Sequence, residues 1–507
     1  MSGAANTDKK TLLTNAAWNF LSFASAVVVA FVMCPKLVHG LGDEHYGIWC
    51  LVEATVAYFT LFDLGIGVSI IRYVAKFEEI RNRDQLNRVF CTTLYIFVGA
   101  AAITLAASAG LAFLWRRPFD VSAEVANDTR WLILLLGAVV AVGLVGSVFA
   151  CVLNALGQFR AKTAIETGNR FVSASLMLTT LASGGGLVHL AAVMLACSLA
   201  KSLVEAIVAR RYLPYLRFSP RFVSLETFRT IRSYSLRAFV VLIAGRISYS
   251  SDAIVIGAFL APQWITPFVL AARLTEYVRD CIWSLTAVLT PAISALETRG
   301  DQEAIRRALL DGTRYILLLI LPVAMGLLML GKPFLSLWLD EPHAEASYPV
   351  LVVLTIAMTF YLSQTVAGRI LYGMGRLGWL TIAAIIEAIA NISISIALIG
   401  PYGILGVAVG TAVPSVCVNV VAAWYICRVL DVPVRSYLRQ AVASPLLLLP
   451  VAPAVWLLAM QWFPPTNWHS WVLVGGAGTL AHAAVAYLVE FRGTAMVPKL
   501  SLSGRQA

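Results

Sequence analysis

Residues 131–156 read WLILLLGAVVAVGLVGSVFACVLNAL, a run without a charged side chain. A helix needs about 20 apolar residues to cross the hydrocarbon core of a bilayer, so this run is long enough to span it. The whole chain of 507 residues is 59% hydrophobic and only 13% charged, whereas soluble proteins carry about 25% charged residues. The composition therefore disfavours a soluble enzyme, a disordered protein and a nucleic-acid-binding module. It indicates an all-α polytopic membrane protein.

Similar apolar runs recur along the entire chain. The sequence predicts about 14 transmembrane helices, near residues 11–34, 46–71, 89–114, 131–156, 163–183, 186–209, 234–259, 264–292, 309–330, 347–371, 379–399, 402–427, 441–462 and 469–490. Two of them, 163–183 and 264–292, carry charged residues and have the weakest patterns.

The basic residues alternate in abundance from one connecting segment to the next. If the N-terminus is cytoplasmic, 26 of the 38 Lys and Arg residues fall on the cytoplasmic side and 5 on the other side. Cytoplasmic loops of membrane proteins are enriched in Lys and Arg. This asymmetry favours an even number of spans with both termini in the cytoplasm, and it explains the net charge of +11 without a nucleic-acid partner.

Two pairs of sequence segments suggest an internal repeat. Asp84-Gln85 and Asp301-Gln302 each precede a new apolar run, 217 residues apart, and Gly157 to Glu166 resembles Gly378 to Glu387 at an offset of 221. An even number of spans per unit makes such a repeat parallel. We therefore expect two six-helix lobes in a parallel repeat plus two C-terminal helices, with an N-lobe at 1–212, a cytoplasmic linker at 213–233, a C-lobe at 234–430, and the last two helices and tail at 431–507.

Two short motifs carry a resemblance to a known family. Phe62-Asp63-Leu64-Gly65-Ile66-Gly67, followed by Ile71-Arg72-Tyr73, and Ser251-Asp252-Ala253-Ile254-Val255-Ile256-Gly257 are similar to patterns in the polysaccharide transporters of the multidrug/oligosaccharidyl-lipid/polysaccharide exporter superfamily. The chain most closely resembles the Wzx-type lipid-linked oligosaccharide flippases. It departs from their pattern at Gln263-Trp264, where a Gly-x-Tyr is common.

The resemblance implies a fold, a function and a location. It implies two helix bundles around a central cavity, and alternating-access translocation of a lipid-linked oligosaccharide to the outer leaflet of the cell inner membrane. The implied partners are a polyprenyl-linked glycan, membrane lipids and polysaccharide-assembly proteins. No catalytic residue, metal site or cofactor is expected, apart from a coupling proton or sodium ion.

Charged residues within the predicted spans are the candidate site residues. A charge near the bilayer centre costs about 2.5–3.5 kcal/mol on insertion scales, so it should face a cavity or a partner. Arginine binds phosphate through a planar fork and stays charged, which suits an anionic lipid headgroup. The predicted cavity residues are Arg246, Arg273, Arg279, Arg369 and Asn19, and the predicted supporting or ion-coupling residues are Asp63, Asp252, Glu276 and Asp280.

Structural roles for these charges remain open alternatives. Arg273 with Glu276, three residues apart on one helical face, would also make a static pair, as would Arg246 with Asp252. Glu166, Arg170, Lys201 and Glu205 would likewise serve as a network within the N-lobe, and the Gly406 to Gly410 pair would permit close helix packing.

Two other functions compete with the flippase. A cation-coupled multidrug exporter of the same superfamily would favour a carboxylate-rich cavity, yet residues 11–34 contain no Asp or Glu. A membrane glycan polymerase or glycosyltransferase would need a large outer loop, whereas the two longest outer segments, 116–130 and 331–346, are too short to hold a core of their own. We therefore expect a transporter, not an enzyme.

Overall fold

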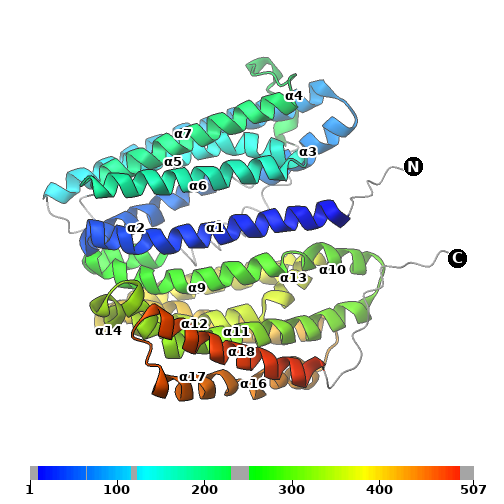
Figure 1. Cartoon of the computed structure of the whole chain (residues 1–507). Helices are drawn as coiled ribbons and strands as arrows, with labels where there is room; N and C mark the ends of the chain where they lie inside the picture. Colours follow the sequence, from blue (N-terminus) through cyan, green and yellow to red (C-terminus); the bar gives the residue numbers. More distant parts are fainter. Residues whose placement is uncertain (1–8, 64–65, 116–122, 230–250, 492–507) are drawn as a thin grey trace. The chain divides into compact units, whose positions relative to one another are not determined.

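The computed structural model describes residues 9–63, 66–115, 123–229 and 251–491. These residues are almost entirely helical, and they contain no β-strand (Figure 1). The predicted all-α fold class is confirmed. The described residues fall into two compact units, one formed by Met1–Val269 with Thr381–Thr411 and the other by Leu270–Leu380 with Ala412–Ala507. Their boundaries differ from those of the lobes inferred from the repeat, and the six-plus-six-plus-two division stays a prediction.

Ten helices are long and apolar enough to cross a membrane, counted over the described residues. One of them, Gly378–Val429, covers two predicted spans. Two further predicted spans are helical but are not among the ten: 46–71 is interrupted by a 3-10 turn, and 163–183 is more polar. The predicted span 234–259 lies mostly outside the described residues. The prediction of a multi-pass membrane protein is thus confirmed, while the total of 14 transmembrane helices stays a prediction.

The first unit holds most of the N-terminal half of the chain. Its elements are α1 Lys9–Leu41, α2 Asp43–Ala57, η1 Tyr58–Asp63, α3 Ile66–Glu79, α4 Arg83–Leu114, α5 Ala123–Ala155, α6 Phe159–Ala182, α7 Leu187–Tyr212, η2 Pro220–Phe222, the helical residues 251–259, η3 Pro262–Trp264, and residues 381–411 of α14 Leu377–Val429.

The core of the first unit lies where α3, α4, α5 and α7 meet. Phe90, Phe97, Val148 and Leu153 are buried there together. These side chains form continuous apolar faces at helical spacing, and burying such faces is the main contribution to packing between neighbouring helices.

The chain after α7 is fixed to the start of α4. The Asn87 side chain donates to the carbonyl of Tyr215 at 3.2 Å and accepts from the backbone N–H of Arg217 at 2.8 Å. The Cys91 thiol donates to the carbonyl of Arg217 at 2.9 Å. The described part of the predicted linker therefore packs against the first unit and does not extend freely from it.

The second unit contains the remaining helices. They are α9 Ile265–Thr286, most of which belongs here, α10 Leu289–Thr298, α11 Gln302–Trp338, α12 Glu341–Ser363, α13 Thr365–Gly373, the end of α14 Leu377–Val429, α15 Val434–Tyr437, the π-helix η4 Leu438–Ala443, α16 Ser444–Leu447, α17 Val451–Trp462 and α18 Trp468–Phe491.

The last two predicted spans are anchored on α11. Trp456 of α17 is 1% exposed, and its indole N–H donates to the carbonyl of Gly475 in α18 at 3.3 Å. The indole of Trp471 donates to the carbonyl of Leu330 in α11 at 3.2 Å. Tryptophan used in this way combines a large apolar surface with one directional bond, so these helices form an integral part of the second unit.

A single glycine divides α14 into two helices. Gly403 has a φ of 56° and a ψ of −140°, a backbone conformation that only glycine adopts readily. The two halves then pack closely, because a Cβ atom on Gly410 would lie 2.2 Å from the hydroxyl oxygen of Ser395. The predicted packing role of the Gly406 to Gly410 pair is confirmed at this hairpin.

Candidate functional site

Asp252 lies at the start of the helical segment 251–259 and is 8% exposed. The hydroxyl of Thr411 lies 3.1 Å from each of its two carboxylate oxygens and donates to the carboxylate. Asn391 donates from its amide to the same hydroxyl at 2.9 Å. The helical residues 251–259 and the two halves of α14, which are distant in sequence from them, are thus linked through one buried carboxylate and one hydroxyl, all within the first unit.

Further oxygen atoms bond to the two partners in this chain of contacts, Asn391 and Thr411, or to one another. The Ser251 hydroxyl donates to the amide oxygen of Asn391 at 3.4 Å, and the Ser395 hydroxyl donates to the carbonyl of Val407 at 3.4 Å. The Thr411 hydroxyl lies 3.2 Å from the same carbonyl. We call Ser251, Asp252, Asn391, Ser395, Thr411 and the Val407 carbonyl the oxygen cluster.

The composition of the oxygen cluster limits which ions it suits. It contains one carboxylate, and the other members are neutral hydroxyl, amide and carbonyl groups. Calcium sites take six to eight oxygens, several of them from carboxylates. No group of three or more His, Cys, Asp and Glu residues converges within the described ranges. The donor set therefore fits a monovalent cation or a proton, as predicted for Asp252, whose coupling role stays a prediction.

Sequence reasoning singled out Asp252 but missed its partners. Asn391 and Ser395 are four residues apart in a mostly apolar run, so they share one helical face, and that spacing was the available signal. Thr411 gave no such signal, because a single threonine is common in an apolar helix.

A second group of polar side chains lies along α9. Arg273 pairs with Glu276 at 3.5 Å, and Arg279 pairs with Asp280 at 3.3 Å. The side chains of Arg273 and Asp280 are 39% and 49% exposed, so this face of α9 is only partly covered. The predicted static pair of Arg273 with Glu276 is present, and both charges still reach the surface of the second unit.

Arg369 reaches the same helix from α13. Its guanidinium donates to the carbonyl of Trp283 at 3.0 Å and to the hydroxyl of Thr286 at 3.5 Å. The guanidinium of Arg279 lies 5.5 Å from the centre of the Trp283 ring, a cation–π distance. Arg279 and Arg369 therefore both contact Trp283, a residue that sequence reasoning did not identify. We call Arg273, Arg279, Arg369 and Trp283 the arginine face.

The other predicted site residues lie elsewhere. Asp63 ends η1 and accepts from the backbone N–H of Gly67 at 3.3 Å, which places its negative charge at the N-terminus of α3, where the helix dipole favours it. Asn19 belongs to α1, but its side chain lies outside the described part of the structure. Arg246 lies outside the described residues, as does its proposed pairing with Asp252.

The charges in α6 and α7 make local contacts. Arg170 donates to the carbonyl of Ser22 at 2.8 Å and to the hydroxyl of Ser25 at 2.7 Å, which ties α6 to α1. Lys201 lies 3.4 Å from Glu205, one helical turn away. These contacts are structural and lie inside the first unit, but they do not join all four residues in the expected network: Arg170 bonds to α1, and Glu166 pairs with Lys162 at 3.0 Å.

Comparison with known proteins agrees with these observations. The model of the family described as "Polysaccharide biosynthesis protein" matches residues 12–297, more than half of the chain. The class that the fold defines is that of multi-pass helical membrane proteins, with ten helices long and apolar enough to cross a membrane among the described residues. The chain is a member of the polysaccharide biosynthesis protein family, and the resemblance seen in the sequence motifs is confirmed.

Three similar proteins illustrate the relationship. A succinoglycan biosynthesis transport protein of Rhizobium meliloti is 25% identical over 75% of this chain and 73% of its own. A probable low-salt glycan biosynthesis flippase of Haloferax volcanii is 25% identical over 39% of this chain and 42% of its own. The structure of a lipid II flippase in an inward closed conformation has a TM-score of 0.71 and 15% identity, covering 95% of this chain and all of that one, and shows the same fold. This chain is a transporter, as predicted, and not an enzyme.

Proposed function

We propose that this protein is a flippase that moves a lipid-linked oligosaccharide from the cytoplasmic to the outer leaflet of the cell membrane by alternating access. The observation that carries the proposal is membership of the family over residues 12–297, together with relatives named as a glycan biosynthesis flippase and a succinoglycan transport protein. The substrate would be a polyprenyl-linked glycan. Polysaccharide-assembly proteins would supply and receive it.

The arginine face supplies the chemistry that such a substrate needs. A lipid diphosphate is anionic and cannot cross about 30 Å of hydrocarbon unaided. Arg279 and Arg369 present guanidinium groups at membrane depth, where each contacts Trp283 and an acidic or carbonyl oxygen. These contacts satisfy the guanidinium groups when no substrate is bound. A diphosphate would replace weaker contacts with bidentate, charge-assisted hydrogen bonds.

The oxygen cluster supports a coupling role for Asp252. A monovalent cation or a proton bound there would reduce the negative charge of the cluster, whose one carboxylate is Asp252. Its members come from the helical segment 251–259 and from both halves of α14, so an ion held there would tie these segments together. We propose sodium or a proton as the coupling ion.

Both termini and residues 213–229 would face the cytoplasm, and the segment around Asn127 would face outward. The distribution of Lys and Arg supports this orientation.

Reconstituted transport tests the function. Vesicles carrying a fluorescent polyprenyl-diphosphate oligosaccharide are treated with a membrane-impermeant glycosidase, which cleaves only glycans that have reached the exposed leaflet. We expect Arg279→Ala to reduce the rate of exposure at least tenfold, while Arg376→Ala leaves it unchanged. Arg376 is a matched control because it is exposed at the start of α14, away from the arginine face. Equal rates in empty and protein-containing vesicles would contradict the flippase.

A further inference from the structure

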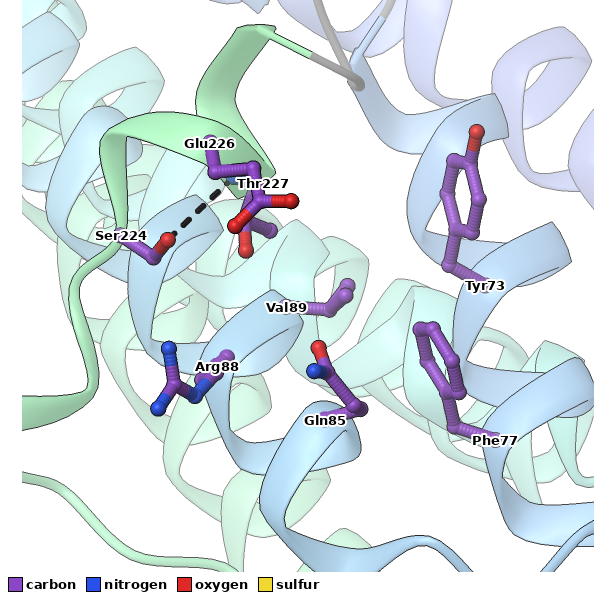
Figure 2. A pocket seen from close by; sticks show the side chains of 8 residues that line it. All are labelled: Tyr73, Phe77, Gln85, Arg88, Val89, Ser224, Glu226 and Thr227. Atoms are coloured by element: carbon purple, nitrogen blue, oxygen red, sulfur yellow. Dashed lines mark hydrogen bonds between the residues drawn. The ribbon is translucent and has the colours of Figure 1, made fainter.

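A pocket opens at the end of the first unit where α3 and α4 meet the chain after α7. Its volume is about 100 Å³, so it is smaller than the pockets that hold drug-sized ligands and has room only for a small group. Figure 2 shows side chains from all three segments facing it. The pocket is lined by Tyr73, Phe77, Gln85, Arg88, Val89, Ser224, Glu226 and Thr227.

One wall of this pocket is aromatic. Tyr73 and Phe77 are one turn apart on α3, and their rings stack with centroids 6.3 Å apart and planes 21° apart. Both side chains are half-buried, so part of each ring is open to the pocket (Figure 2). Val89 of α4 adds a further apolar side chain to the lining (Figure 2).

The opposite wall is polar and held in place. The backbone N–H of Ser224 donates to the hydroxyl of Thr92 at 3.1 Å, which fixes the segment to α4. The backbone N–H of Thr227 donates to the Ser224 hydroxyl at 3.4 Å (Figure 2). This wall is therefore formed before any ligand arrives, which lowers the entropic cost of binding.

A hydrogen bond from the hydroxyl of Tyr215 also holds the segment that leads to the polar wall. The Tyr215 hydroxyl donates to the carboxylate of Glu78 at the end of α3. Burial, and then this bond, raise the pKa of Tyr215 to about 12. The phenol consequently keeps its proton at cytoplasmic pH, and the bond persists.

The charges of the pocket argue against a phosphate ligand. Its lining contains one cation, Arg88, and one anion, Glu226, so the two formal charges cancel. An anion site built from side chains would present an excess of Arg or Lys. The remaining polar groups are an amide and two hydroxyls, which both donate and accept hydrogen bonds.

We propose that this pocket binds one sugar unit of the glycan substrate on the cytoplasmic side. A pyranose ring has an apolar C–H face, which packs against aromatic rings, and a rim of hydroxyls, which matches the amide, hydroxyl, carboxylate and guanidinium groups opposite. The proposal rests on the proposed function for its choice of ligand and its orientation. The pocket then serves as an entry subsite that holds a sugar before the lipid-linked glycan is moved.

Binding of simple glycosides tests the pocket without any transport step. The full-length protein in nanodiscs is mixed with the methyl glycosides of glucose, galactose and N-acetylglucosamine, and saturation-transfer NMR reports contact with their ring protons. We expect transfer from the wild type, and about 3- to 10-fold weaker binding after Phe77→Ala, the loss of one aromatic contact. Gln85→Ala provides a second variant, because Gln85 is exposed and its loss should not disturb folding.

Gln302→Ala is the matched control. Gln302 is also an exposed glutamine in the first turn of a long helix, α11, but it lies in the second unit. We expect it to bind glycosides like the wild type. Absence of transfer from all three glycosides, equal binding by all variants, or competition by millimolar inorganic phosphate would overturn the proposal. Glycoside binding at this pocket by a protein that moves no lipid-linked glycan would instead contradict the proposed function alone.

Discussion

Replacing Thr411 by valine removes one hydroxyl from the centre of the oxygen cluster and keeps the shape of the side chain. The hydroxyl lies 3.1 Å from both carboxylate oxygens of Asp252 and donates to the carboxylate, and it accepts from Asn391. Hydrogen bonds to charged groups contribute about 1.5–3 kcal/mol each. If the cluster binds a monovalent cation through these oxygens, the same loss should weaken apparent Na⁺ affinity about 10- to 100-fold, since 1.4 kcal/mol corresponds to a factor of ten.

The assay is thermal unfolding of the purified protein in NaCl and in choline chloride at equal ionic strength. A ligand that binds only the folded state stabilises it in proportion to the logarithm of its concentration over its dissociation constant. We expect Na⁺ to stabilise the wild type, and Thr411→Val to need much more Na⁺ for the same shift. Thr411→Ser, which keeps the hydroxyl, should retain most of the response.

Thr355→Val is the control, because it makes the same change at a buried position whose hydroxyl has no hydrogen-bond partner among the residues that the structure describes, whereas the half-buried Thr411 has several. Its replacement should be neutral or slightly stabilising, and the Na⁺ response should be unchanged. Loss of the Na⁺ response in both variants, or in neither, would refute the reasoning. Stabilisation by acidic pH that ignores Na⁺ would assign the coupling ion as a proton.

Three further predictions follow from single contacts. Trp456→Ala should destabilise the second unit by about 3–5 kcal/mol, as expected for a buried aromatic. A melting temperature unchanged from that of the wild type would show that α17 and α18 do not contribute to the stability of the unit. A cysteine introduced at Asn127 should react with an impermeant maleimide added outside intact cells and one at Arg221 should not, both positions being exposed; the reverse pattern would overturn the orientation. Tyr215→Phe should loosen the segment after α7 and speed its amide hydrogen exchange, whereas Tyr212→Phe, at an exposed position, should leave exchange unchanged.

The fold class was predictable because membrane spans leave a strong local signal. Runs such as 131–156 exceed the length needed to cross a bilayer, and α5 covers nearly all of that run. Interruptions were harder to see. The η1 turn at Tyr58–Asp63 interrupts the run predicted as one span at 46–71, and Asp63, the acidic residue that ends the turn, is the local signal in the sequence.

The pairs within one helix were predictable for the same local reason. Arg273 and Glu276 are three residues apart, a spacing that places them on one face, and they form the expected pair. Contacts between distant segments were not predictable. Arg369 donates to the carbonyl of Trp283, 86 residues away, and a backbone acceptor leaves no trace in the amino-acid sequence.

The oxygen cluster depends both on the local backbone of α14 and on a contact with a segment that is distant in sequence. Gly403 reverses the chain, and Gly410 allows the two halves of α14 to approach closely enough for Asn391 to donate to Thr411. The helical segment 251–259 then adds Asp252. An ion can shift a conformational equilibrium only by its difference in affinity between the two states. If the three segments separate during transport, the ion loses most of its oxygen ligands and its affinity falls. Ion binding at this cluster would therefore favour the state in which the segments are packed together, which is the coupling that an ion-driven flippase requires.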